Sequence, residues 1–129
     1  NANPASMLAA VQALVALPGQ GRSVAVLGAM AELGPDSHEL HRGCGRNMVQ
    51  EKLDFLLAVG ETAFPLVDNE FKNCRTFKLK DHREAADWLL SHTNAGDRIL
   101  LKGSRSSAME KVLELLQNHE NKNNEESEE

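Results

Sequence analysis

The sequence predicts a doubly wound α/β domain, a Rossmann-like fold with a mostly parallel sheet and helices on both faces. Val24–Leu27 (VAVL) and Phe55–Val59 (FLLAV) are unbroken apolar runs, which are typical of strands buried on both sides. Amphipathic segments separate the runs, and this alternation favours right-handed crossovers between parallel strands. A chain of 129 residues suffices for one such domain with a hydrophobic core.

The first helix is expected to begin at Pro4. Asn3 can cap the amide groups of its first turn, and proline fits the first helical position. Pro18 and Gly19 end the helix. Its apolar residues share one face: Met7, Leu8, Val11, Leu14 and Val15.

The segment Ser23–Gly34 (SVAVLGAMAELG) organises the rest of the chain. Its strand ends at Gly28, where a glycine lets the backbone turn sharply and approach a ligand. Asp36 and Glu39 then form a capping-box pattern, which predicts a second helix up to about Gln50.

Two further strands follow this helix. Phe55–Val59 ends at Gly60, just as the first strand ends at a glycine. Arg75–Leu79 alternates polar and apolar residues, which places it nearer a sheet edge. The short helix expected between these strands has three apolar residues in step: Phe64, Val67 and Phe71.

A helix and a fourth strand are predicted next. Asp81 and Glu84 repeat the capping pattern, and the buried side of their helix is expected to comprise Trp88, Leu89 and Leu90. The strand Arg98–Leu101 ends in Lys102 and Gly103. Three of the four predicted strands therefore end at a glycine.

The last predicted helix is followed by a polar tail. Ser107 and Glu110 are expected to cap the helix, whose apolar face comprises Met109, Val112, Leu113 and Leu116. Beyond Asn118 the composition is polar and acidic, which predicts disorder. The predicted organisation is one domain over residues 1–118 and an acidic tail over residues 119–129.

Composition argues against several classes of partner. The net charge is −5, but residues 119–129 hold five glutamates against one lysine, so the remaining body is nearly neutral. The sequence shows no basic face and no aromatic stacking platform, which argues against a nucleic-acid partner. Cys44 and Cys74 lack a metal-like spacing and fit a reducing compartment. The sequence predicts no membrane span and no export signal, and its start on a helix cap without Met indicates a piece of a longer protein.

Ligands of doubly wound sheets collect at the carboxyl ends of the strands, and the best candidate there is Lys102–Arg105 (KGSR). Its backbone amides and two cations could hold a carboxylate or a phosphate. The alternative interpretation of these four residues is a solvated turn.

Four residues are additional candidates for the site. Glu32 could meet a ligand amine or a metal, although most exposed glutamates bind nothing. His41 lies early in a helix at this edge, where a lone histidine is more often a packing residue. Asn1 and Asn3 could hydrogen-bond a base or a ribose, and Asn3 also serves as a cap.

The chain lacks the sequence signatures of a catalytic centre. It has no Walker phosphate loop, no GxGxxG after the first strand, no nucleophile elbow and no Cys/His metal cluster. A response-regulator-like domain is an alternative, prompted by Lys102, but it needs a phosphorylatable aspartate where this chain has Gly28 and Gly60. The residues alone predict a ligand-binding α/β domain without its own catalytic centre.

With these motifs in view, the chain resembles the C-terminal domain of the Mur ligase family, most closely the branch that adds D-alanyl-D-alanine. The resemblance extends to about Asn118. Its motifs occur in the family's order: NANPAS at 1–6, VLGAMAELG at 26–34, LHRGCG around His41, and KGSRSSAME at 102–110.

The resemblance implies a bacterial, cytoplasmic, ATP-dependent acid–amino acid ligase of peptidoglycan precursor synthesis. Such an enzyme joins D-alanyl-D-alanine to UDP-N-acetylmuramoyl-tripeptide through an acyl phosphate. An N-terminal domain binds the UDP substrate, and a central domain binds most of ATP and Mg²⁺. The C-terminal domain closes over the cleft, so the isolated chain is expected to be inactive.

The resemblance also assigns expected roles to individual residues. Asn1 and Asn3 resemble nucleotide-contacting asparagines. Lys102, Ser104 and Arg105 resemble the family's KGSR group, which faces the incoming dipeptide or the phosphates. Glu32 and His41 match family positions without an assigned role. Ala29 replaces an aspartate that is usual in the family, which leaves a non-catalytic regulatory module as a further alternative.

Overall fold

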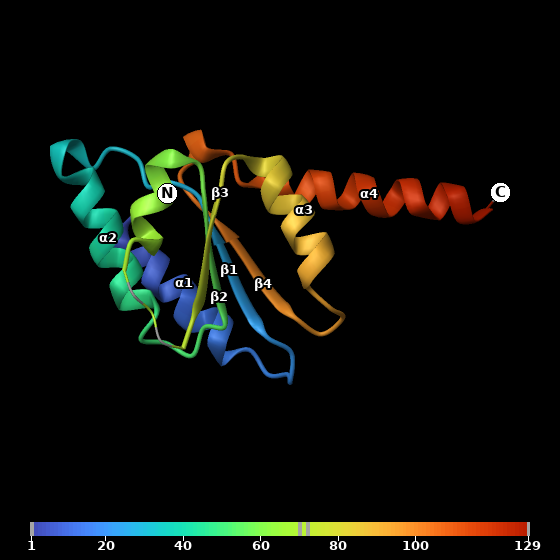
Figure 1. Cartoon of the computed structure of the whole chain (residues 1–129), viewed down its shortest axis with the longest axis horizontal. Coiled ribbons are helices and arrows are strands. Elements are labelled where there is room, and N and C mark those ends of the chain that lie inside the picture. Colours follow the sequence, from blue (N-terminus) through green and yellow to red (C-terminus); the bar gives the residue numbers. More distant parts are fainter. Residues whose placement is uncertain (1, 70, 72, 129) are drawn as a thin grey trace.

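The structure, a computed structural model, describes residues 2–69, 71 and 73–128. Its described strands form one parallel sheet in the order β3-β2-β1-β4 (Figure 1). From β1 the chain steps outward to β2 and β3, and then returns to the other side of β1. The predicted doubly wound α/β fold is confirmed. The strands are β1 (Ser23–Leu27), β2 (Phe55–Val59), β3 (Arg75–Leu79) and β4 (Arg98–Lys102).

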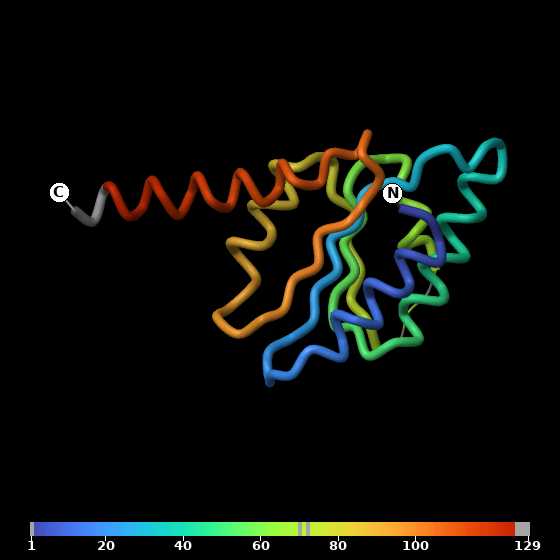
Figure 2. The backbone as a smooth tube through the Cα atoms, turned by 180° about the vertical axis from the view of Figure 1, so that it is seen from behind, coloured from blue at the N-terminus to red at the C-terminus, as the bar shows by residue number. Residues whose placement is uncertain are grey.

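Helices cover both faces of the sheet. One face carries α1 (Pro4–Ala16), α2 (Ser37–Met48) and the 3₁₀ helix η2 (Glu61–Val67), and the other carries α3 (His82–His92) and α4 (Glu110–Glu128) (Figures 1 and 2). Each face has its own cluster of buried apolar side chains. This two-sided cover explains why every residue of β1 and β2 is buried, as their unbroken apolar runs predict.

Two of the four predicted caps form as expected. The Asn3 Oδ1 atom accepts a hydrogen bond from the Ser6 amide at 2.9 Å and caps α1, and Asp81 Oδ1 accepts from the Glu84 amide at 2.9 Å and caps α3. The cap predicted at Asp36 is wrong. The chain enters α2 through the 3₁₀ turn η1 (Gly34–Asp36), which already supplies helical backbone, and the Asp36 side chain makes no cap hydrogen bond.

Two leucines assigned to buried faces lie in solvent instead. Leu90 of α3 is 45% exposed and Leu113 of α4 is 46% exposed, whereas their neighbours Leu89 and Val112 are buried. One step along a helix rotates the side chain by about 100°, so a residue next to a core position points away from the sheet. The apolar stripes of α3 and α4 are therefore narrower than the sequence suggests.

The start and the end of α4 both differ from expectation. A 3₁₀ turn, η3 (Arg105–Ser107), and the left-handed residue Ala108 precede α4, so Ser107 is not its cap. Disorder was expected from residue 119, but α4 continues to Glu128 and projects from the body of the domain (Figure 2). A helix already nucleated by packed turns propagates through residues such as glutamate and lysine. No described helix is long and apolar enough to cross a membrane.

Both cysteines are core residues of the α1/α2 face. Cys44 is 4% exposed and Cys74 is 7% exposed, and neither forms a disulfide. Burial raises the pKa of the Cys44 thiol to about 11 and, together with the nearby Asp54 charge, raises that of Cys74 to about 12. Both side chains are therefore neutral packing groups at pH 7.

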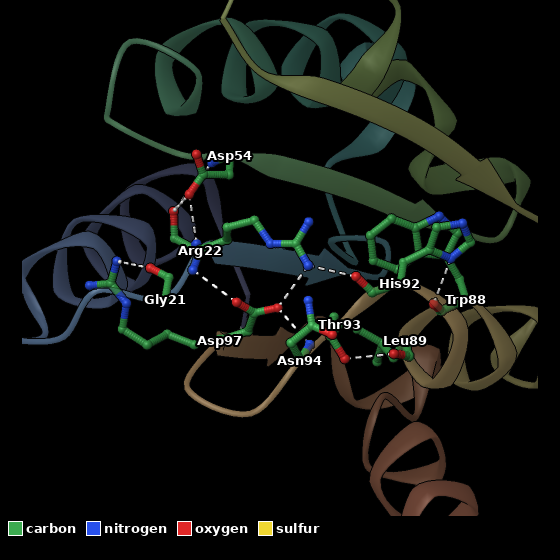
Figure 3. A network of polar contacts seen from close by, with 11 residues as sticks. Gly21, Arg22, Asp54, Trp88, Leu89, His92, Thr93, Asn94 and Asp97 are labelled. Carbon is green, nitrogen blue, oxygen red and sulfur yellow. Dashed lines mark hydrogen bonds and ion pairs between the residues drawn. The ribbon is translucent and has the colours of Figure 1, made fainter.

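A polar network joins the amino ends of β1 and β4 (Figure 3). Arg22 Nη2 donates to Asp97 Oδ2 at 2.9 Å, and the backbone amides of Arg22 and Asn94 donate to the same carboxylate at 2.9 and 2.8 Å. Arg22 Nη2 also donates to the His92 carbonyl at 2.6 Å. The Arg22 side-chain hydrogen bond, followed by the two amides, lowers the pKa of Asp97 to about 2.

This network should make stability depend on pH in the acidic range. Because the folded-state pKa of Asp97 lies below its ordinary value of 3.8, its contribution is complete above about pH 4 and is lost as pH falls toward 2. Asp97→Asn should lower the urea midpoint at pH 7 and lose less further stability between pH 4.5 and 2.5 than the wild type. Asp87→Asn, at an exposed position of α3, is the control. An equal acid dependence in Asp97→Asn and the wild type would contradict this prediction.

Candidate functional site

The loops after β1 and β4 meet at the carboxyl edge of the sheet, where the strand order reverses. The Gly28 amide donates to the Lys102 carbonyl at 2.9 Å, and the Ser104 amide donates to the Ala29 carbonyl at 2.8 Å. The pairing of β1 with β4 thus continues past the strand ends. The two predicted site segments form one hydrogen-bonded platform.

Gly28 and Gly103 are required here for space. A Cβ atom on Gly28 would lie 2.7 Å from Ser107 Oγ, and a Cβ on Gly103 would lie 2.3 Å from the same atom. Neither glycine has the positive φ that a sharp turn would demand, whereas Gly60 does, at 88°. Ser107 fills the space between the two strand ends, and its hydroxyl donates to the Ser104 carbonyl at 2.6 Å.

A cavity of about 230 Å³ lies on this platform, and we call it the rim cavity. It brings together three of the predicted site residues, Glu32, Ser104 and Arg105. Ser104 is buried, whereas Glu32 and Arg105 are exposed. Ala2, which directly precedes Asn3, closes one side, so the start of α1 and the KGSR loop share one rim. The full lining is Ala2, Ala31, Glu32, Ser104, Arg105 and Ser106.

Two open grooves flank the rim cavity. One, of about 500 Å³, contains Lys102 together with Ser104, Arg105 and the first turn of α4. The other, of about 590 Å³, runs over the ends of β1 and β2 and the start of α3, and shares Glu32 with the rim cavity. Lys102 therefore lines a different space from Glu32, whereas Arg105 borders both the first groove and the rim cavity.

The predicted nucleotide-contacting asparagines are placed only in part. Asn1 lies outside the described residues. Asn3 is exposed at the rim, but its carboxamide oxygen accepts the Ser6 amide and its backbone amide donates to Ser6 Oγ at 3.0 Å. The oxygen of Asn3 is therefore committed to the helix cap, and a contact with a nucleotide would use the amide nitrogen.

His41 has a different place from the other candidates, because it is fully buried. Its Nε2 atom accepts the Met30 amide at 2.9 Å, and its Nδ1 lies 2.7 Å from the Ser37 carbonyl. This pattern assigns the neutral tautomer with the proton on Nδ1. Both ring nitrogens are used within the fold, so His41 anchors the loop after β1.

His82 is a residue of the site that sequence reasoning missed. From the first turn of α3, its Nε2 donates to the Ser107 carbonyl at 2.7 Å and ties that helix to the loop after β4. No motif in the sequence signals this contact, because it depends on how closely α3 approaches η3. The link continues through Ser107 and Ser104 to the loop after β1.

The platform offers amides, hydroxyls and opposite charges, but no metal site. Within residues 2–69, 71 and 73–128, no group of three or more His, Cys, Asp or Glu side chains could hold a metal ion. The described ion pairs include neither Glu32 nor Arg105. The arrangement can bind a small polar ligand with both a positive and a negative end.

Residues 1–105 match the model of a known family. Its description is "Mur ligase, glutamate ligase domain". The match includes the segment Ser23–Gly34 and both loops of the platform, up to Arg105. It therefore covers the sheet and all the residues that line the rim cavity except Ser106.

Curated relatives carry the name UDP-N-acetylmuramoyl-tripeptide–D-alanyl-D-alanine ligase. The protein of Escherichia coli is 38% identical over 124 residues, which is 91% of this chain, and that of Bacillus subtilis is 31% identical over 116 residues, or 88% of this chain. This chain spans 25% of the length of each. The similarity is to one quarter of those proteins.

Solved structures give the same result in three dimensions. The MurF ligase of Thermotoga maritima, in complex with ADP, superposes with a TM-score of 0.76 at 30% identity, covering 95% of this chain and 27% of that one. MurF of Acinetobacter baumannii gives a TM-score of 0.75 at 32% identity, covering 92% of this chain and 26% of that one. The whole described domain is similar to one part of these enzymes.

Proposed function

The chain belongs to the Mur ligase family, and from this we propose that it is the C-terminal domain of an ATP-dependent ligase that adds D-alanyl-D-alanine to UDP-N-acetylmuramoyl-tripeptide. The family resemblance seen in the sequence is confirmed. The observation that supports the specific reaction is the similarity to relatives named for it, up to 38% identical, across nearly the whole chain. The proposed setting is peptidoglycan precursor synthesis in the bacterial cytoplasm.

Amide formation from a carboxylate needs activation, because a carboxylate is a poor electrophile. In the proposed reaction ATP phosphorylates the terminal carboxylate of the tripeptide. The dipeptide amine then attacks the acyl phosphate and inorganic phosphate leaves. The acyl phosphate must be protected from hydrolysis. Closure of the platform over the cleft between the domains would exclude water from it.

The described residues fit a binding role better than a chemical one. They include no cluster of His, Cys, Asp or Glu side chains that could bind a metal ion, and the sequence has no phosphate loop. We therefore place Mg²⁺ and most of the ATP contacts in a central domain. The UDP substrate would lie on an N-terminal domain. Asn1 and Asn3 would contact the nucleotide.

The loop after β4 would contact the dipeptide or the transferred phosphate. Arg105 can form charge-assisted, bidentate hydrogen bonds to either anion, and the buried hydroxyl of Ser104 adds a polar contact beside it. Lys102 would act from the adjoining groove as a point charge. Ala29, which replaces the usual aspartate, lines the other groove, over the ends of β1 and β2.

The test is ADP release by the full-length protein that carries this chain. Release should require both D-alanyl-D-alanine and UDP-N-acetylmuramoyl-tripeptide, and the 129-residue chain alone should release none. Turnover by the isolated chain would contradict the proposal. A full-length protein with an intact phosphate loop that stays inactive with every muramoyl peptide would favour the non-catalytic regulatory module instead.

A further inference from the structure

We propose that Glu32 binds the ammonium group of the incoming dipeptide and so sets the enzyme's preference for a substrate whose amino terminus is free. This inference rests on the proposed function and names the residue that recognises the nucleophile's end of the dipeptide. It requires that the Glu32 carboxylate have no ion-pair partner within the domain, that it border the ligand space, and that its loop be held rigidly.

Availability follows from the charges around the rim cavity. Glu32 has no ion-pair partner in the described part of the chain, and Arg105, which lines the same cavity, has none either. One negative and one positive side chain therefore border a space of about 230 Å³ that also contains the buried hydroxyl of Ser104. A small zwitterion matches this arrangement, because its ammonium and carboxylate complement the two charges.

Placement follows from the backbone of the loop after β1. Glu32 has a φ of 59°, in the left-handed region that glycine favours. For a residue with a Cβ atom this conformation is unfavourable. The fold accepts it at the position where the loop borders both the rim cavity and the groove over the ends of β1 and β2. A ligand that spans these spaces would meet the Glu32 carboxylate between them.

Rigidity follows from two hydrogen bonds that hold the loop just before Glu32. The buried His41 accepts the Met30 amide at 2.9 Å, two residues before Glu32. The Ala29 carbonyl accepts the Ser104 amide at 2.8 Å, which couples the Glu32 loop to the loop that carries Arg105. Because both loops are fixed before a ligand arrives, little entropy is lost when the charges pair with it.

The first experiment measures steady-state kinetics of the full-length protein. Glu32→Gln should raise KM for D-alanyl-D-alanine at least tenfold and change KM for ATP and for the UDP substrate less than twofold. Glu120→Gln, at an exposed position of α4 that lines neither the rim cavity nor the two grooves, is the matched control and should leave all three constants unchanged. An unchanged dipeptide KM in Glu32→Gln would overturn the proposal.

The second experiment separates ammonium binding from a general structural effect. Propionyl-D-alanine is the dipeptide without its amino group, and its inhibition constant is compared with the dipeptide KM. The wild type should bind this analogue at least tenfold more weakly than the dipeptide, and the ratio should fall toward one in Glu32→Gln. A ratio that is the same in both proteins would overturn the proposal. A wild type without ligase turnover would instead refute the proposed function.

Discussion

Arg105→Ala in the full-length protein is expected to lower kcat/KM for D-alanyl-D-alanine by about 100-fold, because a hydrogen bond to a charged group contributes about 1.5–3 kcal/mol. Arg105 lines both the rim cavity and the adjoining groove, so an anion in either space meets its guanidinium. The measurement is ligase kinetics with ATP and the UDP substrate held at saturation.

Two variants control for charge and for folding. Arg105→Lys keeps the positive charge but loses the planar fork, and it should recover only part of the activity. Arg83→Ala removes an exposed arginine of α3 that borders neither space and should behave as the wild type does. Lys102→Ala tests the second cation. Wild-type kinetics in Arg105→Ala would remove this residue from the site.

Gly45→Ala should destabilise the domain by about 3 kcal/mol or more, at the upper end of what overpacking costs. A Cβ atom at this position of α2 would lie 1.8 Å from the backbone carbonyl oxygen of Leu66 in η2. Neither backbone can rotate away as a side chain would, so the two helices would have to separate. Urea unfolding followed by circular dichroism measures the loss.

Gly43, two residues earlier on the same helix, provides the control. A Cβ atom there would meet nothing within 4 Å, and its φ is not in the left-handed region. Gly43→Ala should therefore stabilise the domain by about 0.5–1 kcal/mol through helix propensity alone. If both glycine variants changed the free energy of unfolding alike, close packing of α2 on η2 would not explain the need for Gly45.

Local patterns predicted much of the fold because they act over a few residues. The apolar runs at Val24–Leu27 and Phe55–Val59 became central strands, and the alternating Arg75–Leu79 became an edge strand. The caps at Asn3 and Asp81 formed as expected, since a cap involves only the residue and the amides of the next turn.

Contacts between distant segments could not be predicted in this way. Gly28 and Gly103 are 75 positions apart in the numbering, and their need for space arises only when β1 pairs with β4 and Ser107 lies between them. The link from His82 to Ser107 likewise depends on where α3 comes to lie. Leu90 and Leu113 are exposed because the width of a buried stripe depends on what packs against the helix.

The sequence by itself determined the fold class, the order of the elements and the family to which the chain belongs. Only the tertiary structure decided that Glu32, Ser104 and Arg105 share a cavity, that Lys102 lines a separate groove, and that His41 is an anchor inside the fold. The physical reason is the distance along the chain over which each interaction acts. Apolar periodicity and caps are local properties of the chain, whereas a cavity and a buried hydrogen bond exist only after distant segments have packed together.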